Sequence, residues 1–348
     1  MKKLLVIRND KLGDFMLILP ALALLKKAMP ELEITALVPE YTAPMAKICP
    51  YIDKIILDVP SEDKKAVKAL ITEIREQQFD ATINFYASLH NAKICFLSRI
   101  KKRFAPATKI FQLLYNYRIK QRRSHSIKPE YEYNLDLARA FLQEEGIDAS
   151  QIEVHAPYLF LNPERIEQQR NKLIALSQRI LKLDKKWIFV HCGSGGSATN
   201  LTLQQYADII HALLEKFDAQ VLLTAGPGEL ERVERLEKLI HEPQHVVVYE
   251  SHDGLVDFTY SLACADLFIS GSTGPLHISS ALNVPTIAFY PARRSATALR
   301  WQTVNDERLS FSAPAGKHTE MDLSLISVDE IFPEIMSFVE KQFCRKYD

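Results

Sequence analysis

Short apolar runs alternate along the chain with longer stretches in which apolar residues recur every three or four positions. The first pattern is typical of buried strands and the second of amphipathic helices. Strands that alternate with helices build parallel sheets with crossover helices, so the pattern predicts an α/β protein. The predicted strands of the first half cover residues 4–7, 34–38, 54–57 and 81–85, and its predicted helices cover residues 14–29, 43–48, 66–77 and 92–98.

The second half repeats this scheme. Its predicted strands cover residues 188–191, 221–224, 246–249, 267–270 and 286–290, and its predicted helices cover residues 203–217, 229–240, 255–264 and 276–282. A helix over 162–181 bridges the halves, 310–323 has no clear period, and 328–343 is a last helix whose packing partner the sequence leaves open. We expect two Rossmann-like domains, 1–165 and 166–348, with ligands in a deep cleft between them.

Composition narrows the cellular context more than the function. The 43 Lys and Arg residues balance 43 Asp and Glu residues, so the net charge indicates no class of partner. The five cysteines are scattered without a C-x-x-C motif, which favours reduced thiols over a disulfide scaffold or zinc site. The N-terminal apolar run is too short for a signal peptide, and no run is long enough to span a membrane. We therefore expect a cytoplasmic protein.

Two polar turns rich in glycine follow predicted strands of the second half. One covers residues 270–277 and the other residues 192–200. Each resembles an ordinary connection between a strand and a helix, but free N–H groups at such helix starts also bind phosphate. Two such turns at strand ends in one half are typical of a nucleotide site in an open α/β sheet. Neither fits the P-loop, and the turn at 192–200 lacks the third glycine of the dinucleotide fingerprint, so an NTPase and a dehydrogenase are disfavoured.

Three side chains near strand ends have both a structural and a chemical interpretation. Asp14 stands near a helix start, where it satisfies free N–H groups or acts as a general base. His277 is a phosphate donor or an ordinary capping or core histidine, and Glu229 binds ribose hydroxyls or is an exposed first-turn acid. The sequence has no D-x-D motif, so backbone dipoles and side chains would have to stabilise the leaving diphosphate of a nucleotide sugar.

Residues 81–129 contain eleven Lys and Arg residues and no Asp or Glu. A solvated face is the usual interpretation, but a field of one sign also serves a phosphorylated substrate, an acidic membrane surface or a nucleic acid. Interleaved aromatic residues suit a lipid-linked acceptor or stacking on single-stranded nucleic acid. No RNA-binding or helix-turn-helix signature is present, which argues against nucleic acid.

Taken in order, these motifs resemble glycosyltransferase family nine, whose best-known members are the ADP-heptose:lipopolysaccharide heptosyltransferases. The residues that carry the resemblance are Leu12-Gly13-Asp14, Gly193-Ser194, Gly226-Pro227-Gly228-Glu229 and Ser272-Thr273-Gly274-Pro275-Leu276-His277. The resemblance implies the GT-B fold, with the donor nucleotide in the C-terminal domain and the acceptor in the N-terminal domain. It also implies inversion at the sugar without a metal or other cofactor.

The resemblance assigns roles residue by residue. Asp14 is similar to the catalytic base of the family. The donor-nucleotide contacts that it implies are Cys192, Gly193, Ser194, Glu229, Ser272, Thr273, Gly274 and His277. The basic stretch would face the phosphorylated inner core of a lipid-linked acceptor at the membrane surface, through Lys93, Arg99, Lys101, Arg118, Lys120 and Arg122.

The chain departs from the heptosyltransferase pattern at two places. Those enzymes usually carry a lysine ahead of a Trp-Pro pair where this chain has Thr199-Asn200-Leu201-Thr202, and many carry Asp where it has Ser272. We expect transfer of heptose from ADP-heptose. Another nucleotide sugar, a GT-B sugar-nucleotide epimerase and a non-catalytic sugar-nucleotide-binding relative are the alternatives.

Overall fold

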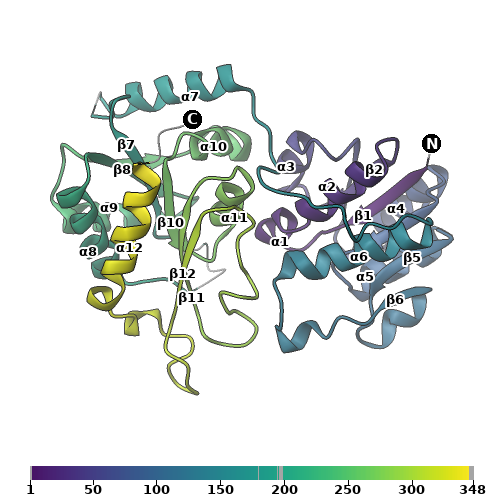
Figure 1. Ribbon diagram of the computed structural model, residues 1–348. Helices are drawn as coiled ribbons and strands as arrows, with labels where there is room; N and C mark the ends of the chain where they lie inside the picture. Colours follow the sequence, from purple (N-terminus) through teal and green to yellow (C-terminus); the bar gives the residue numbers. More distant parts are fainter. Residues whose placement is uncertain (1, 179, 194, 196–198, 345–348) are drawn as a thin grey trace. The chain divides into compact units, whose positions relative to one another are not determined.

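The computed structural model describes residues 2–178, 180–193, 195 and 199–344. The chain divides into two compact units, Met1–Leu159 and Phe160–Asp348. Each unit contains one six-stranded sheet whose strands are all parallel (Figure 1). The division falls before helix α7 (Pro163–Leu176), whereas the sequence places the domain boundary inside this segment.

The sheet of the first unit has the order β3-β2-β1-β4-β5-β6. Its strands are β1 (Lys3–Ile7), β2 (Glu33–Val38), β3 (Lys54–Leu57), β4 (Ala81–Asn84), β5 (Lys102–Pro106) and β6 (Tyr117–Ile119). From β1 the chain adds strands in one direction, to β2 and β3, and then returns to the other side of β1 with β4. The switch point of this sheet therefore lies between β1 and β4. In open α/β sheets, ligands bind beyond the carboxyl ends of the strands at such a switch point.

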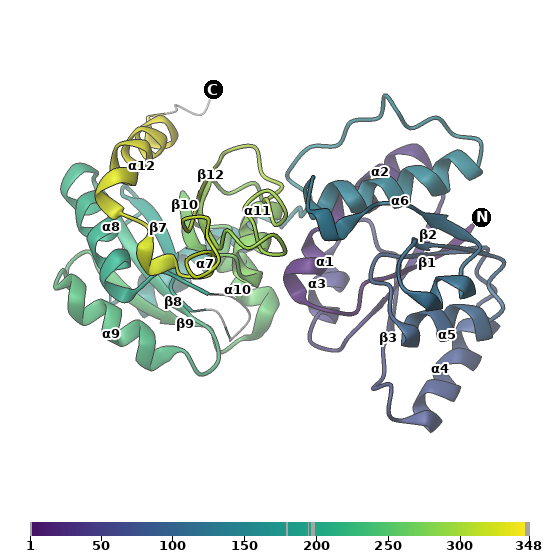
Figure 2. The same ribbon diagram turned by 90° about the horizontal axis from the view of Figure 1, so that it is seen from below.

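Helices cover both faces of this sheet. They are α1 (Leu12–Met16), α2 (Leu19–Ala28), α3 (Ala43–Ile48), α4 (Lys64–Glu76), α5 (Leu89–Leu97) and α6 (Glu130–Glu144), with 3₁₀ turns η1 (Ile110–Leu114) and η2 (Arg123–His125). Helices α2 and α6 pack together on one face, and α4 and α5 pack together on the other (Figure 2). The apolar core on the α4 and α5 side includes Leu5 and Ile7 of β1, Ile74 of α4 and Ile94 of α5. The buried apolar sides of α4 and α5 therefore meet the sheet, as the sequence pattern predicts.

The first predicted helix, over residues 14–29, is wrong in its continuity, because the chain forms α1 and α2 with a break at Leu17 and Ile18. Pro20 lies in the first turn of α2. A proline has no N–H and its ring clashes with the carbonyl of the residue four positions earlier, so a helix ends before it and restarts around it.

Three elements of the first unit are absent from the predicted set: β5, β6 and α6. The two strands extend the sheet at its edge, and their basic residues obscure the apolar alternation. Helix α6 buries Tyr133, Leu137 and Phe141, which are spaced by four residues and so share one face. Strands β5 and β6 thus make part of the basic stretch an edge of the first sheet.

The sheet of the second unit has the order β12-β11-β10-β7-β8-β9. Its strands are β7 (Lys186–His191), β8 (Ala219–Ala225), β9 (Val246–Glu250), β10 (Leu267–Gly271), β11 (Thr286–Tyr290) and β12 (Arg308–Ser312). Its helices besides α7 are α8 (Leu203–Lys216), α9 (Leu230–Ile240), α10 (Gly254–Leu262), α11 (Gly274–Ala281) and α12 (Val328–Phe343), with the 3₁₀ turn η3 (Leu323–Leu325). The switch point lies between β7 and β10, the two strands that precede the glycine-rich turns.

The end of the chain belongs to the second unit. Helix α12 packs on α8 and β12, and Ile335 and Val339 are buried in the core that α8 and α9 share with the sheet. The sequence leaves this packing open, and the structure decides it. The prediction of an irregular segment over 310–323 is wrong at its start, because β12 pairs with β11 and Phe311 stacks on Phe289 with ring centroids 5.8 Å apart.

Candidate active site

The two glycine-rich turns of the second unit meet at one edge of its sheet. Strands β7 and β10 are parallel neighbours, so their carboxyl ends lie side by side. A Cβ on Gly271, at the end of β10, would lie only 2.7 Å from Asn200 Oδ1 in the loop after β7. The Asn200 amide donates to the carbonyls of Cys192 and Gly193, both at 2.9 Å. Glycine at 271 therefore allows the loop after β7 to lie directly against the turn after β10.

Glu229 closes the other side of this edge. Its carboxylate accepts hydrogen bonds from the backbone N–H of Gly195 at 2.7 Å and from that of Gly226 at 3.0 Å. A Cβ on Gly193 would lie 2.1 Å from Glu229 Oε2, so any larger residue there would displace the carboxylate. Two backbone N–H groups from separate loops thus converge on one anionic group. Converging N–H groups of this kind also suit a phosphate oxygen or a sugar hydroxyl.

His191, at the end of β7, lies against Glu229. Its Nε2 is 3.5 Å from Glu229 Oε2, and its Nδ1 is 3.1 Å from the carbonyl of Thr224. Burial lowers the pKa of His191, which outweighs the opposite effect of Glu229. The ring therefore lies between Thr224 on its Nδ1 side and the Glu229 carboxylate on its Nε2 side. His191 is not among the predicted site residues, although its place directly before a glycine-rich turn is a usable signal.

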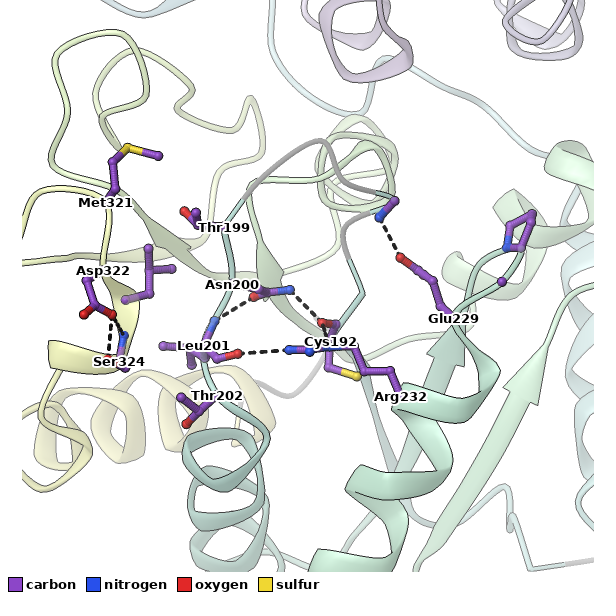
Figure 3. Close-up of a pocket in the computed structure, with 14 residues that line it drawn as sticks. Cys192, Thr199, Asn200, Leu201, Thr202, Glu229, Arg232, Met321, Asp322 and Ser324 are labelled. Carbon is purple, nitrogen blue, oxygen red and sulfur yellow. Dashed lines mark hydrogen bonds between the residues drawn. The ribbon is translucent and has the colours of Figure 1, made fainter.

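A pocket of about 820 Å³ opens beside these groups (Figure 3). Its walls come from the loop after β7, the start of α9 and residues 321–324 ahead of α12. Arg232 donates to the carbonyls of Cys192 at 3.0 Å and Leu201 at 3.2 Å, and so ties α9 to the loop. Among the predicted donor contacts, Cys192 and Glu229 line this pocket.

The turn at 272–277 lies at the neighbouring strand end and does not line the pocket. Ser272 is half-buried, and Gly274 begins α11 with Thr273 as its N-cap residue. The Thr273 side chain makes no hydrogen bond to the helix N–H groups, which leaves them able to meet an anionic ligand. His277 is 4% exposed, its Nδ1 has no hydrogen-bond partner among the described residues, and burial lowers its pKa to about 4. Ser194, another predicted contact, lies outside the described residues.

Asp14, in the first unit, lies in α1 just beyond the end of β1. Its carboxylate pairs with the guanidinium of Arg8, which also bonds Asp10 at 2.7 Å and Glu130 at 3.2 Å. Burial raises the pKa of Asp14 to about 6, although Arg8 acts in the opposite direction. Burial disfavours the charge on Arg8, but Asp14, Asp10 and Glu130 together raise its pKa above the usual range. Asp14 is thus a buried, oriented carboxylate that is still ionised at neutral pH.

The predicted acceptor contacts lie around the β5 and β6 edge of the first unit. All six are exposed, and none forms an ion pair within the described ranges: Lys93, Arg99, Lys101, Arg118, Lys120 and Arg122. Other basic residues of the same stretch form ion pairs within the first unit. Lys102 pairs with Glu145 at 3.0 Å, and Lys128 pairs with Asp136 at 2.5 Å.

No group of three or more His, Cys, Asp or Glu side chains within the described part of the chain is arranged to hold a metal ion. No helix there combines the length and apolar character needed to cross a membrane.

Residues 67–322 match the sequence profile of Glycosyltransferase family 9 (heptosyltransferase). The chain belongs to this family. It is 52% identical over 346 residues to a Haemophilus influenzae protein whose own assignment as a glycosyltransferase is provisional, covering 99% of this chain and 98% of that protein. It is 24% identical over 308 residues to lipopolysaccharide heptosyltransferase 1 of Campylobacter coli, covering 84% of this chain and 85% of that protein.

The fold agrees with this assignment. The E. coli ADP-heptose lipopolysaccharide heptosyltransferase II superposes with a TM-score of 0.77 at 16% identity, over 99% of this chain and 100% of that chain. This chain therefore has the GT-B fold of two Rossmann-like units, which confirms the predicted fold class. Family membership also confirms that the protein is a glycosyltransferase.

Proposed function

We propose that this glycosyltransferase moves heptose from ADP-heptose to a phosphorylated inner-core sugar of a lipopolysaccharide acceptor, with inversion and without a metal. The observation that carries the proposal is the convergence of Glu229 with the Gly195 and Gly226 N–H groups beside a pocket of about 820 Å³ beyond the carboxyl ends of β7 and β8. Two relatives support the donor and acceptor classes, because their names specify lipopolysaccharide and, in one case, ADP-heptose.

Asp14 is the proposed catalytic base. In the reaction, Asp14 takes the proton of the acceptor hydroxyl while that oxygen attacks the anomeric carbon of the donor. The bond from the anomeric carbon to the diphosphate oxygen breaks, and ADP leaves with the bonding electron pair. Because burial raises the pKa of Asp14 to about 6, the carboxylate is a stronger base than an ordinary aspartate and remains ionised at pH 7.

The second unit is the proposed donor site. Glu229 and the loop at Cys192, Gly193 and Ser194 would bind the ribose and the phosphates. The N–H groups at Thr273 and Gly274 would stabilise the leaving diphosphate, beside the neutral ring of His277. Ser272 would contribute its hydroxyl at the same turn. These groups would replace the divalent ion of other transferases, which agrees with the lack of a D-x-D motif in the sequence.

We place the acceptor on the first unit and the enzyme in the cytoplasm, at the membrane surface where a lipid-linked acceptor lies. The exposed bases Lys93, Arg99, Lys101, Arg118, Lys120 and Arg122 would meet its phosphates. The proposal includes no nucleic-acid partner.

One observation favours a second donor. Where heptosyltransferases usually carry a lysine, the Asn200 amide is occupied with two backbone carbonyls and supplies no positive charge. A nucleotide sugar other than ADP-heptose is therefore the second candidate.

A thermal-shift panel with ADP, UDP, GDP, CDP and CMP, with and without EDTA, tests the donor assignment, because a ligand of the native state raises its apparent stability. We expect a shift with ADP that EDTA does not change. A preference for UDP or GDP would exclude ADP-heptose as the donor, and an ADP shift that EDTA abolishes would exclude the metal-independent mechanism.

A further inference from the structure

Two neighbouring elements of the first unit carry apolar side chains on the side that faces away from the core. Ile110 and Leu113 of η1 are 83% and 70% exposed, and Phe96 and Leu97 at the end of α5 are 48% and 46% exposed. We call these four residues, with the elements α5 and η1 that pack together, the α5–η1 surface.

The opposite side of the same elements packs against the apolar core of the first unit. Ile94 and Cys95 of α5 are fully buried in the core, and Phe111 and Leu114 of η1 pack partly buried against it. A surface helix normally has one apolar stripe and a polar outer face. Because α5 and η1 are apolar on both sides, their outer side is suited to a second apolar environment.

Exposed positive charges flank the apolar side chains along the chain. Lys93 on α5, Arg99 and Lys101 after it, and Lys109 before η1 are all exposed, and the sequence from 81 to 129 contains no acidic residue. Arg103 is not counted among these exposed charges, because its guanidinium donates to the carbonyls of Ile100 and Leu114. The whole chain is neutral, so this surface is a local concentration of charge.

Four apolar side chains are too few for a stable protein interface, which buries roughly 1,200–2,000 Å² in total. Stacking on single-stranded nucleic acid needs exposed aromatic rings. Here the most exposed side chains are aliphatic, and the one exposed ring, Phe96, has the Arg103 guanidinium 5.5 Å from its centroid. A bilayer has neither requirement, because a few inserted apolar side chains and several bases near anionic headgroups add up to binding.

We propose that the α5–η1 surface docks the enzyme on an anionic membrane, with Ile110 and Leu113 inserted among the lipids and Lys93, Lys101 and Lys109 on the headgroups. This inference rests on the proposed function, because it identifies the face that brings the enzyme to a lipid-linked acceptor. The docking itself needs neither donor nor acceptor.

The test is co-sedimentation of the full chain with vesicles of phosphatidylcholine alone and with 30% phosphatidylglycerol. We expect binding to the anionic vesicles that weakens as salt rises. The apolar variant Ile110→Ser/Leu113→Ser should lower the partition coefficient by roughly tenfold or more. The basic variant Lys93→Gln/Lys101→Gln/Lys109→Gln should lower it by roughly 100-fold, since each base near the surface contributes about fivefold.

Matched controls lie in the second unit, at exposed residues. Leu176→Ser/Leu183→Ser removes two apolar side chains that are 59% and 55% exposed, and Arg235→Gln/Lys238→Gln/Lys317→Gln removes three exposed positive charges. Both controls should bind vesicles as the wild type does. All variants should keep the wild-type melting temperature because every changed side chain is exposed.

Three results would overturn the docking surface. They are equal loss of vesicle binding in the controls, wild-type binding by the Ile110→Ser/Leu113→Ser variant, and binding to neutral vesicles that salt does not weaken. Tighter binding of a single-stranded oligonucleotide than of anionic vesicles would assign the surface to nucleic acid instead. Transfer to a soluble, delipidated acceptor separates the two proposals. The Ile110→Ser/Leu113→Ser variant should retain it, and a protein that docks but transfers nothing contradicts the proposed function alone.

Discussion

Arg8 opposes the effect of burial and lowers the pKa of Asp14, so replacing it should move the pH dependence of catalysis in a predictable direction. The guanidinium pairs with Asp14, Asp10 and Glu130 inside the first unit. With Arg8 present the pKa of Asp14 is about 6, and about 90% of the carboxylate is ionised at pH 7. In wild-type enzyme, kcat/KM should therefore rise with pH through a midpoint near 6 and level off above it.

The Arg8→Gln change removes a positive charge in contact with Asp14. An adjacent opposite charge lowers the midpoint of a carboxyl by roughly one to three pH units, so its loss should move the midpoint of kcat/KM up by that amount. For a move of about two pH units, kcat/KM at pH 7 falls about tenfold, and raising the pH to 9 restores most of it. The Glu130→Gln change should move the midpoint down, because Glu130 raises the pKa of Asp14.

The assay is kcat/KM for transfer from pH 5 to 9, with melting temperatures measured over the same range. Arg8→Gln leaves buried carboxylates without their cation and should cost roughly 3–5 kcal/mol of stability. The double variant Arg8→Gln/Glu130→Gln removes one of those carboxylates, so it should recover part of the stability. Midpoints that move in the same direction in the two single variants, or that do not move, would refute the assignment of this limb to Asp14.

Three other changes test the second unit. Gly193→Ala forces the Glu229 carboxylate away from Gly195 and Gly226, so isothermal titration should show ADP binding weakened by roughly tenfold or more; unchanged affinity would remove Glu229 from the donor site. The folded-state pKa of His277 is about 4, below its unfolded value of about 6.5, so its neutral form contributes stability above pH 6.5 that is lost as pH falls through 4. Chemical denaturation should therefore show that the unfolding free energy falls by about 3 kcal/mol more in wild type than in His277→Asn when the pH is lowered from 6.5 to 4. An equal fall in both proteins would contradict the buried neutral ring. Ile335→Ala should cost about 2–5 kcal/mol in the same experiment because this α12 side chain is fully buried, and a cost below 1 kcal/mol would show that α12 does not pack on the core.

The alternation of apolar runs with amphipathic stretches was enough to predict the α/β class and most strands, because buried parallel strands are apolar over their whole length. The alternation was not enough where an element is short or charged, or where a proline interrupts a helix. The edge strand β6 has three residues, one of them a charged arginine, and so carries almost no signal. Helix α6 is absent from the predicted elements although it has a clear apolar stripe. Pro20 breaks the first predicted helix, whose apolar residues continue at helical spacing across the break.

The candidate site, too, could be predicted from the sequence only in part. Motif order selects Asp14, Glu229 and the two turns as candidates because each follows a strand, and their roles stay predictions. Within the second unit, the order β10-β7-β8 places the strand ends that precede the two turns and Glu229 side by side. The Arg8 interactions were not predictable, because Glu130 lies 122 positions from Arg8 in the chain and meets it only through folding. Sequence spacing likewise gives no account of the raised pKa of Asp14, which depends on its burial.

The most direct test of the central claim is transfer from ADP-heptose to a phosphorylated inner-core acceptor by wild type and Asp14→Asn, in EDTA, with the anomeric configuration of the product read by NMR. We predict that wild type forms an inverted product, and that Asp14→Asn binds ADP normally but loses roughly 10²–10⁴-fold in kcat. Wild-type turnover by Asp14→Asn, or a product of retained configuration, would contradict Asp14 as the base of an inverting transfer.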